Sequence, residues 1–135
     1  MICQADVIES IAGLDFEWIE RKLTKTDPNI AREWTSEGVR DAISQYRNFM
    51  FLLYKYSETH RLVPSIEVDE IWHHHILDTR KYFEDCEKVY GRYMHHFPYF
   101  GMRGEEDFAN LQRSFESTQK LYFQHFEEYM YEVDF

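Results

Sequence analysis

Residues 63–91 read VPSIEVDEIWHHHILDTRKYFEDCEKVYG, and they decide the fold because helix start and stop signals enclose a long amphipathic pattern. Pro64 and Ser65 mark a start, since serine is a favoured N-cap residue. Gly91 marks a stop, since glycine readily takes the left-handed conformation that ends many helices. The stretch therefore predicts one helix from about Ile66 to Tyr90.

The three adjacent histidines of this predicted helix differ in their expected surroundings. At about 100° per residue, the apolar side chains fall within one arc, which we expect to be the buried face. Its members are Trp72, Ile76, Tyr82, Phe83, Cys86, Val89 and Tyr90. His75 falls inside this arc, and His73 falls at its edge. His74 falls on the opposite side, where we expect it to face water.

Three further segments carry the spacing of amphipathic helices. Residues 5–24 are predicted to be helical in part, with an interruption at Gly13. A second helix is predicted from about Ser36 to Tyr56, because apolar residues recur there at steps of three and four. These residues are Val39, Ile43, Tyr46, Met50 and Leu53. A last helix opens at Glu105, and its apolar seam is Phe108, Leu111, Phe115, Thr118, Tyr122, His125 and Tyr129.

These segments predict an all-α protein. The connector 24–35 joins the first two of them, and we expect Trp34 to anchor it in the core. No stretch alternates convincingly enough between polar and apolar residues to require a sheet. We therefore expect a compact bundle of about four amphipathic helices, in a single domain that covers residues 1–135.

Charge and composition limit the partners. The formal net charge is −10, from 25 acidic and 15 basic side chains, and this field repels a phosphate backbone. The cysteines Cys3 and Cys86 form no disulfide framework, and the first ten residues lack the basic start and apolar run of a secretory signal. No stretch approaches the ~18 apolar residues of a membrane span. We therefore expect a cytoplasmic protein that binds neither nucleic acid nor membrane.

The helix also brings a carboxylate and an imidazole together. Asp69 and His73 are spaced i, i+4, so they share one helix face. The pair can supply two metal ligands, can transfer protons, or can be an ordinary surface ion pair. His73 and His75 lie about 200° apart on a helix and cannot readily share one ion. One site would therefore use Asp69 and His73 with His96 of the following loop, or His75 with partners from another helix.

Two familiar metal motifs are absent. The chain has no H-E-x-x-H, which argues against a zinc protease of that type. Glu70 and His73 form a single E-x-x-H, whereas di-iron carboxylate bundles use two copies. Zinc and iron both remain suited to mixed imidazole and carboxylate ligands.

The same residues carry a resemblance to a known family. Residues 63–91, followed by HHFPYFGMRGEED at 95–107, resemble bacterial members of the glycine-rich domain-containing protein-like family. The matching positions are Val68-Asp69, Trp72-His73, His75-Ile76, Asp78-Thr79, Tyr82, Cys86, Gly91 and His96-Phe97-Pro98-Tyr99. The resemblance covers about residues 36–125 and leaves the middle position of W-H-x-H open. It therefore implies that His73 and His75 matter and that His74 does not.

The resemblance also raises the question of RNA. Plant relatives are much longer, carry the glycine-rich segment that gives the family its name, and in some cases are linked to RNA binding or stress responses. This chain has five glycines and no such segment. Its acidic charge argues independently against an RNA role.

Three functions stay open from the sequence, in this order. The first is a non-catalytic binding or interaction module, with a structured histidine and aspartate site beside a groove for a protein or small-molecule partner. The second is a metal-binding protein or small metalloenzyme that holds Zn or Fe. Its candidate ligands are Asp69, His73, His75 and His96. The third is a metal-free enzyme in which Asp69 and His73 act as acid and base, and the basic loop 91–104 holds an anionic substrate.

Overall fold

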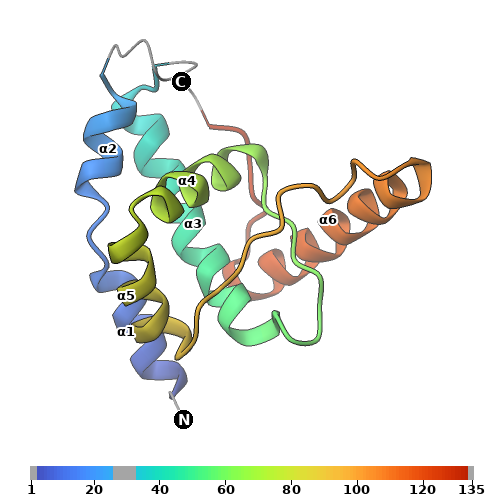
Figure 1. Ribbon diagram of the computed structural model, residues 1–135, viewed down its shortest axis with the longest axis horizontal. Coiled ribbons are helices and arrows are strands. Elements are labelled where there is room, and N and C mark those ends of the chain that lie inside the picture. The colour runs from blue at the N-terminus through green and yellow to red at the C-terminus, as the bar shows by residue number, and fades with distance from the viewer. Residues whose placement is uncertain (1–2, 26–32, 134–135) are drawn as a thin grey trace.

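The computed structural model describes residues 3–25 and 33–133, and within these ranges it contains six α-helices and no strand (Figure 1). The helices are α1 (Gln4–Gly13), α2 (Glu17–Leu23), α3 (Ser36–Tyr56), α4 (Ile66–Leu77), α5 (Thr79–Tyr90) and α6 (Glu105–Phe126). The prediction of an all-α protein is confirmed. The expected number of about four helices is wrong, because two of the predicted segments are each divided.

The long helix predicted over residues 66–90 is broken at Asp78. The backbone of this residue has φ −83° and ψ 76°, which lies outside the helical region. Helix α4 packs mainly on α3, while α5 packs on α1, and the two run in clearly different directions in Figure 1. One straight helix could not cover both neighbours. Asp78 and Thr79 are weak helix formers, so the chain turns there at little cost.

The interruption predicted at Gly13 is confirmed, because α1 ends there and α2 begins at Glu17. Leu14 takes an extended conformation, and α2 begins at Glu17, whose backbone N–H donates to the carboxylate of Asp15 at 2.9 Å. Arg47 of α3 reaches across and donates to the carbonyls of Ile11 and Leu14. This guanidinium satisfies backbone acceptors at the corner and ties it to the central helix.

Helix α3 is the centre of the core. The five residues of its predicted stripe are all buried: Val39, Ile43, Tyr46, Met50 and Leu53. Trp34 is also buried, as expected of an anchor, although residues 26–32 of the connector predicted at 24–35 lie outside the described residues. Most of the other helices pack against α3, which therefore sets the arrangement of the whole molecule.

The seam predicted for the last helix is only partly buried. Thr118 and Tyr122 are buried, but Phe108 is 51% exposed. Helix α6 ends at Phe126, because Glu127 takes the left-handed conformation with φ 60°, so Tyr129 lies beyond it and is 53% exposed. The C-terminal part of α6 lies against the other helices, and its N-terminal part projects away from them (Figure 1).

Phe83 was predicted to lie on the buried face, but it is 55% exposed. The prediction assumed one continuous helix through Asp78, and the break there changes which side of α5 faces the core. Tyr82, Cys86 and Val89 remain buried. Among the described helices, none is both long enough and apolar enough to cross a membrane.

Candidate metal centre

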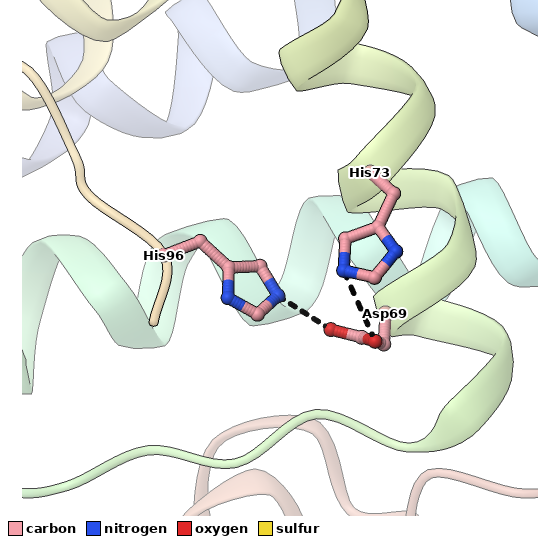
Figure 2. A group of neighbouring side chains, drawn as sticks. All are labelled: Asp69, His73 and His96. Atoms are coloured by element: carbon pink, nitrogen blue, oxygen red, sulfur yellow. Dashed lines mark hydrogen bonds and ion pairs between the residues drawn. The ribbon is translucent and has the colours of Figure 1, made fainter. Parts of the chain in front are cut away.

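Asp69, His73 and His96 form one cluster beside α4 (Figure 2). His73 Nε2 lies 3.3 Å from one carboxylate oxygen of Asp69, and His96 Nε2 lies 2.6 Å from the other. Both imidazoles therefore turn the same ring nitrogen toward a single carboxylate. One ligand atom from each residue lies within 4.8 Å of the other two.

Helix α4 positions the first two members of this cluster. Ser65 caps the helix by accepting from the backbone N–H of Val68 at 3.2 Å. Asp69 lies in the first turn, where the positive end of the helix dipole favours a carboxylate. The i, i+4 spacing then places His73 one turn further along the same face.

Trp72 holds His96 in place. The centres of the two rings are 4.1 Å apart, with 35° between their planes. The indole N–H of Trp72 donates to the Tyr82 hydroxyl at 3.0 Å, and this hydroxyl donates to the carbonyl of Met94, two residues before His96. Trp72 thus fixes the start of the loop, so that His96 meets a carboxylate 27 residues earlier in the chain.

The donor set of the cluster suits a divalent transition metal. Zinc binds imidazole nitrogen and carboxylate oxygen at about 2.0–2.2 Å, which places the donors of a tetrahedral site about 3.3 Å apart. The side chain of His73 is 47% exposed, that of Asp69 is 32% exposed and that of His96 is 11% exposed. An ion can therefore enter from solvent, and adjustments of about an ångström would bring three donors into range.

His75, the fourth predicted ligand, lies apart from this cluster in the core. It is 1% exposed, with Nδ1 2.7 Å from the Tyr46 hydroxyl and Nε2 2.7 Å from the carboxylate of Asp85. Lys81 Nζ lies 3.0 Å from the same carboxylate. His75 therefore belongs to a buried network that links α3, α4 and α5.

The charges in this network follow from its burial. Burial lowers the pKa of His75, against the opposing effect of the Asp85 hydrogen bond. Burial alone would raise the pKa of Asp85, but the hydrogen bonds from His75 and Lys81 outweigh it and lower that pKa. At neutral pH a neutral imidazole thus donates from Nε2 to an ionised carboxylate, and Nδ1 accepts from the Tyr46 hydroxyl.

The sequence pattern missed the partners of His75. Tyr46 was expected only as part of an apolar stripe, and Asp85 was not singled out. A signal existed, because Asp85 lies three residues after Tyr82 and four before Val89, on the buried face of α5. An isolated acid on such a face indicates a buried polar contact.

Two neighbouring predictions have different outcomes. His74 was expected to face water, but it is half-buried, and burial lowers its pKa. Cys86 is buried, as expected of a core thiol, and burial raises its pKa. A raised pKa leaves little thiolate at neutral pH, which disfavours a nucleophilic role.

A large groove adjoins the cluster. Its volume is about 1110 Å³, and it lies between the connector 57–65, the first turns of α4, the loop 92–100, the middle of α6 and the segment 130–132. Asp69, Trp72 and His96 all line it. The cluster therefore opens into a cavity that has room for a partner.

The comparisons with known proteins support the family resemblance found in residues 63–91 and 95–107. The family model described as UCP032817-like matches residues 9–122, which include Asp69, His73 and His96. The chain belongs to the UCP032817-like family. This result confirms the suspected likeness to glycine-rich domain-containing proteins, since a relative with that name also matches.

That relative is Glycine-rich domain-containing protein 1 of Arabidopsis thaliana. It is 39% identical to this member of the UCP032817-like family over an alignment of 67 positions, and the match covers 44% of the chain. The match covers only 8% of the plant protein's own length. No solved structure matches the chain.

Proposed function

We propose that this protein binds one divalent metal ion, zinc in the first place, through Asp69, His73 and His96. The observation that supports the proposal is the meeting of three donor groups from α4 and from a distant loop within 4.8 Å. From the sequence alone, a non-catalytic binding module was the first hypothesis and a metal-binding protein the second. The proposal combines them as a binding module built around a metal. Iron is the second metal to test, because two histidines and one carboxylate suit it as well.

The metal would join the loop 91–104 to helix α4. This loop has little regular structure of its own: a turn at Tyr99–Met102, and backbone N–H groups of Gly101 and Arg103 that donate to Asp107. Coordination of the ion by His96 on one side and by Asp69 and His73 on the other would replace the His96–Asp69 hydrogen bond and the His73–Asp69 ion pair with three coordination bonds. Because metal binding of this kind is coupled to folding, the ion would stabilise one wall of the groove.

A small metalloenzyme is the second candidate, and the number of ligands favours it. Structural zinc sites usually have four protein ligands, whereas catalytic sites have three and keep a position for water. Asp69, His73 and His96 supply three, and two of them line the groove. A bound water would therefore face the cavity, where the ion would lower its pKa.

Calorimetric titration of untagged protein with ZnCl₂ tests the proposal. We expect saturable binding of one ion per chain, and at least a tenfold loss of affinity in each of His73→Ala and His96→Ala. The matched controls are the adjacent histidines: His74→Ala on α4 and His95→Ala in the loop should bind zinc as the wild type does. Quenching of tryptophan fluorescence by Co²⁺ gives a second readout, because the Trp72 ring packs on His96.

Two results would overturn the proposal. One is the absence of stoichiometric binding of either Zn²⁺ or Fe²⁺ at micromolar protein. The other is an equal loss of affinity in the two control variants, which would mean that zinc binds the exposed histidines without a defined site.

A further inference from the structure

Glu67 is a largely buried residue whose carboxylate has no hydrogen-bond or ion-pair partner. The residue is only 8% exposed and lines the groove, and its carboxylate oxygens keep some contact with solvent. Among the described residues, its side chain makes no hydrogen bond and no ion pair. Its position in the first turn of α4 lets the positive end of the helix dipole favour the carboxylate. Without a paired cation, the carboxylate depends on its contact with solvent in the groove.

The charges around the groove leave Glu67 without a cation of its own. The lining contains three other carboxylates, those of Asp69, Glu116 and Glu132. The metal proposed above would use only Asp69. The groove therefore has an excess of negative charge, in a chain whose formal net charge is −10.

The two arginines of the lining are already engaged elsewhere. The Arg61 guanidinium lies over the Phe100 ring, 3.7 Å from its centre. Arg92 donates to the Ser57 hydroxyl at 2.8 Å and lies 3.8 Å from a carboxylate oxygen of Glu58. Neither makes an ion pair with Glu67, so the cation that Glu67 lacks would have to come with a ligand.

The size and lining of the groove indicate what kind of ligand carries this cation. Pockets for small molecules usually measure about 300–1,000 Å³, and this groove is larger, at about 1110 Å³. Much of its wall is apolar, including Leu62, Val63, Met94 and Phe115. Such a surface suits an extended peptide with apolar side chains beside a charged one.

We propose that the groove binds an extended segment of a partner polypeptide, and that a lysine or arginine side chain of this segment pairs with Glu67. Apolar residues next to this basic residue pack on the groove wall. The pair is a charge-assisted hydrogen bond at the wall of the groove. The negative field of the chain also accelerates the approach of a basic partner. This interaction requires Glu67 and does not require the metal.

The test begins with selection from a phage-displayed library of random eight-residue peptides on the full chain in EDTA. The best selected peptide is then synthesised with a fluorescein label, and its affinity is measured by fluorescence anisotropy at 150 mM NaCl. We expect the selected peptides to carry a lysine or arginine flanked by apolar residues. Glu67→Gln should lower the affinity for the synthetic peptide at least tenfold. Glu87→Gln, at an exposed position on α5, should leave this affinity unchanged.

A double-mutant cycle identifies the pair itself. The basic residue of the peptide is replaced by glutamine, and this peptide should bind wild type and Glu67→Gln equally. Agmatine and n-butylamine serve as small cations, and neither should displace the peptide at millimolar concentration. Three results would each overturn the proposal. They are selected peptides that lack a basic residue, equal affinity of the peptide for wild type and Glu67→Gln, and full displacement of the peptide by a small amine. Because the measurements are made in EDTA, their outcome is independent of the zinc titration.

Discussion

Replacing His75 with alanine should lower the free energy of unfolding by about 3–5 kcal/mol. The variant loses both hydrogen bonds of the imidazole and leaves the buried Tyr46 hydroxyl and Asp85 carboxylate without this partner. An unsatisfied buried group costs about 1–3 kcal/mol, and more when it is charged, although Lys81 continues to pair with Asp85. The lost ring also packs edge-on against Phe16, with 4.9 Å between the ring centres. The remaining cost comes from the cavity that this ring leaves behind.

Urea unfolding followed by far-ultraviolet circular dichroism measures this loss. The experiment is done at pH 7.5 in EDTA, so that metal binding makes no contribution, and the free energy comes from linear extrapolation. A domain of this size has a stability of about 5–15 kcal/mol, so the variant should still unfold in a measurable transition. The matched controls are His73→Ala and His74→Ala on the same helix, each expected to change stability by less than about 1 kcal/mol.

A stability of His75→Ala within 1 kcal/mol of the wild type would refute this reasoning. So would an equal loss in His73→Ala, because the side chain of His73 is 47% exposed and contacts the partly exposed carboxylate of Asp69 and the ring of His96. A large loss in His75→Ala alone would separate the buried network from the cluster at Asp69, which is the distinction that the structure makes.

Two further predictions concern alkaline pH and backbone conformation. Burial raises the pKa of Tyr122 to about 12 and that of Tyr46 well above its ordinary value, so the unfolded chain releases these protons first. Their contribution to stability is therefore complete below about pH 10 and is lost as the pH rises toward 12. Thermal melts between pH 9 and 12 should show Tm falling steeply. A constant Tm over this range would contradict the prediction. Gly91→Ala should cost about 1–2 kcal/mol because φ is 71° there, whereas Gly13→Ala should be neutral or stabilising, since an added Cβ meets nothing within 4 Å. Urea unfolding compares the two, and equal effects would be the contrary result.

The sequence predicted the helix ends that depend on local signals. Helix α3 runs from Ser36 to Tyr56 as predicted, with Thr35 accepting from the backbone N–H of Gly38 at 3.0 Å. Gly91 ends α5 in the left-handed conformation. Caps and amphipathic spacing act over one or two helical turns, so a single sequence displays them. The same local geometry predicted the meeting of Asp69 and His73.

Contacts between distant parts of the chain decided where the predicted helix is broken and which residues pair with His75. The break at Asp78 arises because α4 and α5 pack on different neighbours, and no periodicity within residues 66–90 records which neighbours these are. The pairing of His75 with Tyr46 and Asp85 likewise joins three helices.

Local spacing within residues 63–91 by itself therefore predicted that Asp69 and His73 share one face and that His75 faces the core. Only the tertiary structure showed that these residues belong to an open cluster and a separate buried network. It did so because folding brought His96 to Asp69, and α3 and α5 to His75, across separations that local spacing does not encode.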